Sequence, residues 1–434
     1  MKLSIPGDGL NDIAPLRALI QAGRSRMGAT LTVSIVAASL LALTVFNSGV
    51  ARTMATGPDE LLAATADCQA SLPASWQSAV ASAPTATIAA DPDYPSPAPG
   101  FALTGDGKDY FATEYSDKWS GITEIDATTE RTRKLYKFPS GGSDQVLSSG
   151  MEGSWLVFLE WNLDGREQLL AWDASTGSTQ TIAATPALDA EGQITFALDP
   201  DSNSDDVAWS LAAGSPKGGP QTPESLHLLS LTSGNQHLVH SGPVGNIFFW
   251  HNQLDYSIAS SDDAPSSVDH LHLHAVSSTS GQQVAVAQLL SQAGLGRASS
   301  VWDFPQGIAW QEGRAIGESS GTVWILGRDA RHPELVLPGS QLGPPSSVFW
   351  ADGYFFWNYL ATLPDSGIPS IPSTMIVVLG SGSSFKLPDS GDEAVAQGSS
   401  LIYSWVDQFP PTKTAAVWNN VVLHLNQLAR LPGC

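Results

Sequence analysis

Residues 300–337 read SVWDFPQGIAWQEGRAIGESSGTVWILGRDARHPELVL, and this stretch decides the fold of the chain. Its β-branched and aromatic residues predict strands over 300–304, 308–310, 322–326 and 334–337. Short turns containing Gly, Pro or Asp join the first strand to the second and the third to the fourth, which is typical of hairpins. The stretch therefore predicts one antiparallel four-stranded sheet.

The same pattern recurs along most of the chain. Each repeat carries an aromatic residue at the end of its second strand: Tyr115, Trp161, Trp209, Tyr256, Trp310, Trp357 and Trp405. Neighbouring members are 46, 48, 47, 54, 47 and 48 residues apart. A period in this range, carried by β-type residues, indicates a β-propeller with one blade per repeat. We expect an all-β, seven-bladed β-propeller of four-stranded antiparallel blades over residues 101–434, with these aromatic residues packed between blades.

The ring must close, because an open ring leaves unpaired strand edges. Residues 415–418 and 421–425 both read as strands, and Asn419-Asn420 between them reads as a turn. We therefore expect the last blade to supply its own four strands. The alternative is that the arm adds a strand from residues near 76–89.

Residues 101–430 resemble bacterial extracytoplasmic propellers of the TolB-like and WD-repeat-like kind, by repeat pattern and not by a diagnostic motif. This resemblance implies the fold, because propellers host binding, scaffolding and several unrelated chemistries. Residues 171–177, AWDASTG, also look like the blade motif of quinoprotein dehydrogenases. Thr181 stands where that motif carries a Trp, so we expect no cofactor.

An uncharged stretch precedes the repeats. Residues 28–46, GATLTVSIVAASLLALTVF, would span a bilayer as a helix, and basic residues lie mainly before them. We expect a cytoplasmic segment over 1–27, a transmembrane signal anchor or signal peptide over 28–47, and an extracytoplasmic arm with a Pro-rich linker over 48–100. The propeller would then lie outside the cytoplasm, or be secreted if the signal is cleaved.

The chain has two cysteines, Cys68 in the arm and Cys434 at the last position. A pair of this kind in an extracytoplasmic domain predicts a disulfide that clamps the arm against the final strand. Two unpaired thiols, or a bond between chains, are the alternatives.

The formal net charge is −22, from 42 acidic and 20 basic residues. Such a surface repels phosphate backbones, so we expect no nucleic-acid partner. A solvated acidic exterior accounts for most of this charge.

The long loops between second and third strands would lie together on one face of the ring, where binding usually concentrates. Polar residues leaving the second strands are candidate ligand contacts at that mouth: Glu160, Asn162, Asp164, Glu312, Asn358 and Asp407. Solvated loop residues are the alternative interpretation.

Three histidines alternate along one predicted strand, His270, His272 and His274, so their side chains would share a face. Such a set can bind zinc or copper. His227 occupies the position equivalent to His274 one blade earlier, without a cluster, which favours packed or hydrogen-bonded histidines and no metal site. Residues 317–321, GESSG, match G-x-S-x-G, but they lie between two strands, where no nucleophile elbow forms.

We therefore expect an exported, non-catalytic binding module for a protein, peptide or glycan at the long-loop face, tethered to the membrane through residues 28–47. An extracytoplasmic carbohydrate-active hydrolase or lyase is the alternative, and buried polar groups with shifted pKa values in the central funnel would favour it.

Overall fold

The computed structural model describes the following residues, and every structural statement below concerns these residues alone: 69–82, 86–89, 100–115, 119–139, 144–162, 165–185, 194–200, 204–212, 224–250, 253–258, 272–277, 283–285, 298–312, 322–330, 333–337, 345–361, 371–381, 383–387, 393–406 and 417–433.

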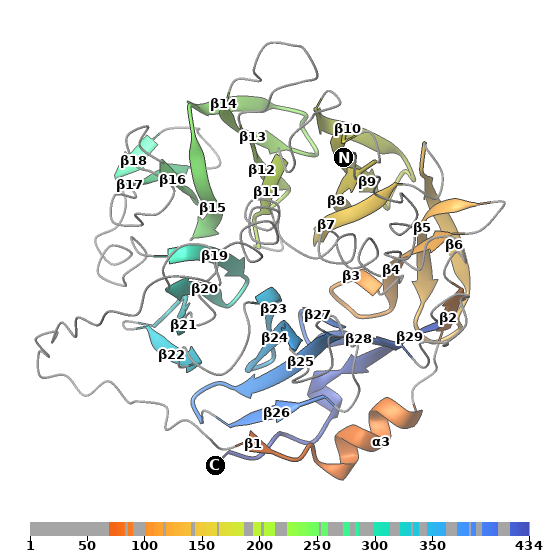
Figure 1. Cartoon of the computed structure of the whole chain (residues 1–434). Helices are drawn as coiled ribbons and strands as arrows, with labels where there is room; N and C mark the ends of the chain where they lie inside the picture. Colours follow the sequence, from red (N-terminus) through yellow and green to blue (C-terminus); the bar gives the residue numbers. More distant parts are fainter. Residues whose placement is uncertain are drawn as a thin grey trace, which may run out of the picture.

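The described strands form seven sheets around a ring (Figure 1), an all-β propeller. The first strand of each sheet faces the middle of the ring, and first strands of neighbouring sheets are in contact. Five sheets consist of four consecutive antiparallel strands each. The first sheet has β3 (Gly100–Leu103), β4 (Asp109–Tyr115), β5 (Ser120–Asp126) and β6 (Thr132–Lys137). The second has β7 (Gln145–Glu152), β8 (Trp155–Trp161), β9 (Glu167–Asp173) and β10 (Thr179–Ala184).

The next three sheets repeat this plan. The third has β11 (Ile194–Leu198), β12 (Asp206–Leu211), β13 (Ser225–Ser230) and β14 (Gln236–Ser241). The fourth has β15 (Val244–Trp250), β16 (Gln253–Ile258), β17 (His272–Ser277) and β18 (Gln283–Ala285). The fifth has β19 (Ala298–Phe304), β20 (Gly307–Glu312), β21 (Thr322–Gly327) and β22 (Glu334–Leu337).

The last two sheets take strands from the arm. The sixth has β23 (Pro345–Ala351), β24 (Tyr354–Ala361), β25 (Ile371–Val378) and β26 (Ser384–Lys386), and β1 (Gln69–Ala70) adds to β26 in parallel. The seventh has β27 (Glu393–Gln397), β28 (Ser400–Val406) and β29 (Val417–His424), and β2 (Ala86–Ala89) pairs with β29 as its fourth strand. The predicted ring of seven self-sufficient four-stranded blades is therefore wrong: six blades supply their own four strands, and the seventh is a composite.

The error lies at Asn419 and Asn420. They form no turn, because β29 runs through them and pairs them with Trp405 and Ser404 of β28. Both residues are buried, and Asn420 Oδ1 accepts hydrogen bonds from the backbone N–H of Gly100, at 3.0 Å, and from the Ser404 hydroxyl. These contacts satisfy the side-chain oxygen of Asn420, while Nδ2 of both asparagines has no hydrogen-bond partner among the described residues. The strand pairing with β28 and the contacts of Asn420 Oδ1 outweigh the turn preference of the two residues.

The predicted transmembrane helix over residues 28–47 has no counterpart among the described helices. The described helices are α3 (Ala74–Ser82) and the short 3-10 helix η4 (Leu425–Gln427), and no helix in the described part of the chain is long and apolar enough to cross a membrane. The 28–47 segment and both cysteines lie outside the described residues.

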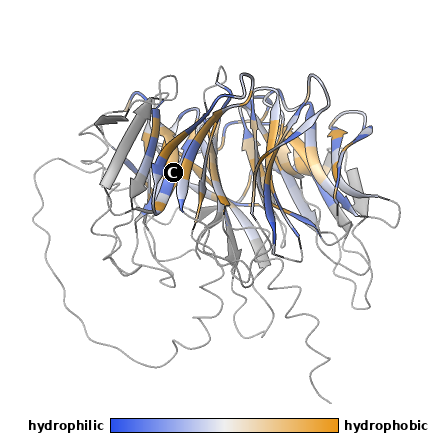
Figure 2. Ribbon diagram, turned by 90° about the horizontal axis from the view of Figure 1, so that it is seen from above, coloured by the Kyte–Doolittle hydropathy of each residue, from blue (hydrophilic) through white to orange (hydrophobic). Residues whose placement is uncertain are grey.

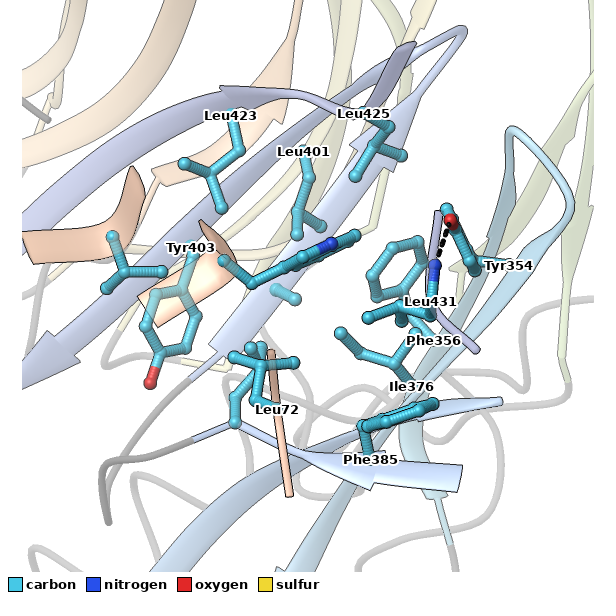
Figure 3. Packing of buried hydrophobic residues seen from close by; sticks show 14 of the residues in the cluster. Leu72, Tyr354, Phe356, Ile376, Phe385, Leu401, Tyr403, Leu423, Leu425 and Leu431 are labelled. Carbon is cyan, nitrogen blue, oxygen red and sulfur yellow. Dashed lines mark hydrogen bonds between the residues drawn. The ribbon is translucent and has the colours of Figure 1, made fainter. Parts of the chain in front are cut away.

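Hydrophobic side chains fill the wedges between neighbouring sheets, and hydropathy is highest along the strands (Figure 2). The repeated aromatic residues take part as expected. The buried ones are Tyr115, Trp209, Tyr256, Trp310 and Trp357. A larger cluster joins the sixth and seventh sheets to α3 and the C-terminal tail (Figure 3), and it includes Leu72, Phe356 and Leu431. This cluster is the core of the ring closure.

Candidate functional site at the acidic inner rim

Each of the first six sheets takes four consecutive antiparallel strands from the chain, so the chain leaves the sheet on the face where it entered and all first strands run the same way. The turns between first and second strands therefore share one face, which we call the turn face. The connections between second and third strands share the opposite loop face. The predicted binding loops belong to the loop face.

Glu160, predicted at the mouth of the loop face, is buried between the first and second sheets. Its Oε2 accepts a hydrogen bond of 2.7 Å from the hydroxyl of Tyr136 on β6. Burial raises the pKa of Glu160 to about 7, against the effect of that hydrogen bond, and the nearby Asp144 raises it further. Glu160 therefore contacts its protein neighbours instead of the mouth.

Asn358 is also a structural residue. Its Nδ2 donates to Ser347 Oγ and to the carbonyl oxygen of Ala394, both at 2.7 Å. Its Oδ1 accepts from Thr374 Oγ1 at 2.7 Å and from the Ala394 N–H at 3.2 Å. All four hydrogen-bonding positions are used, so the side chain ties β23, β24 and β25 to β27.

The structure does not gather the other predicted residues into a site. Asn162 caps a turn, since its Oδ1 accepts from the Arg166 N–H at 3.0 Å. Glu312 lies at the end of β20, where only the backbone is described. Asp164 and Asp407 lie outside the described residues.

The histidine strand is described in part. His272 and His274 belong to β17, opposite Ile258 and Tyr256 of β16, while His270 lies outside the described residues. The related His227 stacks on Trp209 with ring centroids 4.1 Å apart and its Nε2 lies 3.0 Å from Ser225 Oγ. In the described ranges no group of three His, Cys, Asp or Glu residues is placed to hold a metal ion.

A different set of carboxyl groups meets on the turn face. Glu152 is the last residue of β7, Asp199 follows β11, and Asp303 is the penultimate residue of β19. These three first strands belong to the second, third and fifth sheets, so the three side chains come to the inner rim of the ring from different directions. We call this set the inner-rim carboxyls.

Glu152 is the most constrained member. Its residue is 2% exposed, and Oε1 has no hydrogen-bond partner among the described residues. Burial raises the pKa of Glu152 to about 10, and Asp199, Asp303, Asp206 and Asp205 raise it further in that order. Glu152 is therefore protonated near neutral pH, and negatively charged residues of the third and fifth sheets help to keep it so.

Asp303, unlike Oε1 of Glu152, has a hydrogen-bond partner. The N–H of Phe249 on β15 donates a 2.7 Å hydrogen bond to its Oδ2. Desolvation raises the pKa of Asp303 to about 7, and Asp199 also raises it, while the Phe249 hydrogen bond and Arg328 lower it. Asp303 is partly exposed to solvent, as expected for a residue near the end of a first strand that faces the middle of the ring.

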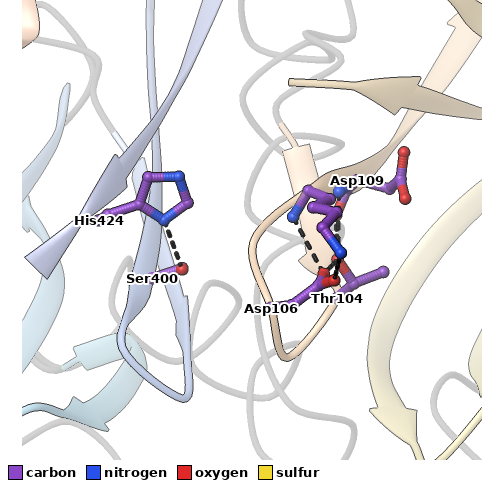
Figure 4. Close-up of polar contacts among 6 residues, drawn as sticks. Thr104, Asp106, Asp109, Ser400 and His424 are labelled. Atoms are coloured by element: carbon purple, nitrogen blue, oxygen red, sulfur yellow. Dashed lines mark hydrogen bonds and ion pairs between the residues drawn. The ribbon is translucent and has the colours of Figure 1, made fainter. Parts of the chain in front are cut away.

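The turn face also carries an exposed ion pair (Figure 4). In the turn between β3 and β4, Asp106 Oδ2 lies 2.7 Å from Lys108 Nζ, and Thr104 Oγ1 donates to Asp106 Oδ1 at 2.9 Å. The hydrogen bond from Lys108 lowers the pKa of Asp106 to about 2. This exposed carboxylate is paired locally, whereas Oε1 of Glu152 has no partner among the described residues.

Sequence reasoning missed the inner-rim carboxyls because it searched the ends of the second strands. The available signal was an acidic residue at the end of several first strands, visible in Glu152, Asp199 and Asp303. Such a position is tolerated in the apolar centre of a ring only when its charge is neutralised or compensated.

No protein-family model matches the chain, and no curated protein matches it. Among solved structures, an oligogalacturonate lyase in complex with manganese has 10% identity and a TM-score of 0.49, over 78% of this chain and 97% of that one. An oligogalacturonate lyase from Vibrio parahaemolyticus has 12% identity and a TM-score of 0.45, over 77% of this chain and 91% of that one. TolB from Acinetobacter baumannii has 13% identity and a TM-score of 0.34, over 60% of this chain and 65% of that one. At these levels the similarity carries no argument about chemistry.

Proposed function

We propose that this chain is an extracytoplasmic, non-catalytic binding module that accepts a positively charged segment of a protein or peptide at the inner rim of its turn face. The observation that carries the proposal is Glu152, a buried carboxyl that has an unpartnered oxygen and on which the charges of Asp199 and Asp303 act. A cationic group at the rim would relieve the repulsion among these carboxyls. The rigid ring holds the carboxyls in place before the ligand arrives, which lowers the entropic cost of binding.

The test uses the full-length protein and a fluorescein-labelled hexa-arginine amide, with binding followed by fluorescence anisotropy. We expect Asp303→Asn to weaken binding about tenfold, which corresponds to about 1.4 kcal/mol. The matched control is Asp329→Asn, which removes the same charge from an exposed position in the β21–β22 turn. Equal affinity of the native protein and Asp303→Asn, or equal binding of a hexa-glutamate peptide, would overturn the proposal.

A carbohydrate-active hydrolase or lyase is the second candidate. The raised pKa of Glu152 favours it, because glycosidases use one protonated carboxyl beside a second carboxyl group. Release of reducing ends from soluble pectin, xylan or starch, lost in Glu152→Gln, would establish the enzyme.

A further inference from the structure

We propose that Glu152 exchanges its proton for the bound cation. Each ligand that binds at the inner rim therefore releases one proton to solvent. This inference rests on the proposed function and concerns the same site. It adds the release of one proton from Glu152 and a pH dependence of affinity.

The geometry supplies a group suited to this exchange. Glu152 closes β7 at the point where the second sheet reaches the middle of the ring, with Oε1 unpartnered among the described residues. A protonated carboxyl can remain buried without a partner at moderate cost, but an ionised one cannot. An ammonium or guanidinium group brought to the rim supplies the missing partner, and guanidinium can donate to carboxyls that approach from several directions.

The balance of the step is simple. Before binding, the Glu152 carboxyl carries its proton. When the cation arrives, the O–H bond of the carboxyl breaks, the proton passes to solvent, and the carboxylate pairs with the cation. The buried site gains one positive and one negative charge together, so its net charge does not change.

The surrounding charges set the direction of the exchange. The carboxyls that act on Glu152 are Asp199, Asp205, Asp206 and Asp303, from β12, the β11–β12 turn and β19. Asp205 is partly engaged elsewhere, since its Oδ2 accepts from the Thr232 N–H at 2.7 Å. Arg328 lowers the pKa of Asp303. The field at Glu152 is therefore negative, and it favours a proton until a cation replaces it.

The experiment is titration calorimetry of the full-length protein with hexa-arginine amide at pH 7.5 in two buffers that differ in ionisation enthalpy. We expect about one proton released per peptide bound by the native protein and by Asp329→Asn, and almost none released by Glu152→Gln. The affinity of the native protein should rise by up to about tenfold per pH unit between pH 8 and 9, above the pKa of about 7 of Asp303, as expected for one coupled proton. Glu152→Gln should lose most of this dependence.

The outcomes separate the two proposals. Binding without proton release, or release that is unchanged in Glu152→Gln, overturns the exchange and leaves the binding function standing. Absence of peptide binding overturns both. If Glu152→Gln fails to fold, the pH dependence of the native affinity decides, because a flat profile excludes a coupled proton.

Discussion

The indole N–H of Trp76 donates a 2.8 Å hydrogen bond to the carbonyl oxygen of Ala429, a residue 353 positions further along the chain. Trp76 lies on α3, is fully buried, and meets Tyr354 of the sixth sheet edge to face at a centroid distance of 5.7 Å. The arm and the C-terminal tail thus meet over the two sheets at which the ring closes.

Replacing Trp76 should therefore weaken the packing of the arm against the sixth and seventh sheets. Trp76→Phe keeps most of the apolar area and loses the hydrogen bond, so we expect a loss of about 1 kcal/mol in unfolding free energy. Trp76→Ala also leaves a cavity and should cost about 3–5 kcal/mol. Urea unfolding followed by Trp fluorescence measures both, with the exposed Ser78→Ala on the same helix as control. A loss in Trp76→Ala no larger than that in the control would contradict this account.

Gly107 and Gly177 provide a matched pair in two turns of the turn face. Both have left-handed backbone, with φ of +69° and +71°. A Cβ on Gly107 would overlap Ser400 of the seventh sheet, whereas nothing lies within 4 Å of a Cβ on Gly177. We expect Gly177→Ala to cost about 1 kcal/mol from backbone strain, and Gly107→Ala to cost at least about 1 kcal/mol more. Thermal unfolding of the two variants compares their stability directly. Equal losses of stability would contradict the expected overlap, because they would mean that the turn at Gly107 shifts to make room for the Cβ.

The repeat could be predicted from the sequence because its cause is local. Alternating strands, short turns and one aromatic residue per repeat are properties of neighbouring residues, and Trp310 and Trp357 pack as expected. The turn that begins at Asp173 is also stabilised by local contacts. The Asp173 carboxylate accepts a hydrogen bond from the Ser175 N–H at 2.8 Å, and Gly177 has a positive φ.

The closure and the site could not be predicted in the same way. The pairing of β2 with β29 joins residues more than 300 positions apart, and the hydrogen bonds to Asn420 in β29 come from Gly100 and Ser404. Likewise, the charge of Asp303 acts on Glu152 only when the sheets are placed around one axis. Polar residues at strand ends look alike in sequence, whether they face solvent, as Asn162 does in part, or lie buried, as Asn358 does.

Stability should depend on pH through Glu160. Its pKa is about 7 in the folded state and about 4.3 in an unfolded chain. A carboxyl whose pKa is raised by folding stabilises the protein fully below the unfolded pKa, and this contribution is lost as pH rises through 7. Glu160→Gln removes the titration and still accepts from Tyr136, so it should be more stable than the native protein at pH 8, by about 1–3 kcal/mol. Urea unfolding at pH 4.5, 6 and 8 tests this, and an unchanged difference across that range would refute it.

The Cys68–Cys434 disulfide remains a prediction, and the residues next to each cysteine support it. Gln69 pairs with Ser384 through β1 and β26, and the adjacent Ser383 hydroxyl donates a 2.9 Å hydrogen bond to the carbonyl oxygen of Pro432. The chain on either side of the proposed bond is therefore held along the same short segment. Such a bond closes a loop around nearly the whole ring and should stabilise the fold by about 5 kcal/mol in the chain-entropy model.

Thiol titration of the denatured, unreduced protein should accordingly find no free thiol, and Cys434→Ser should expose one. Cys434→Ser and the double variant Cys68→Ser/Cys434→Ser should lose the same stability, because either change removes the bond. A dimer on non-reducing gels would mean that the cysteines join two chains instead. Because β1 and the tail contact β26 independently of the sulfur atoms, the reduced protein should still fold, with its arm released before the rest of the ring unfolds.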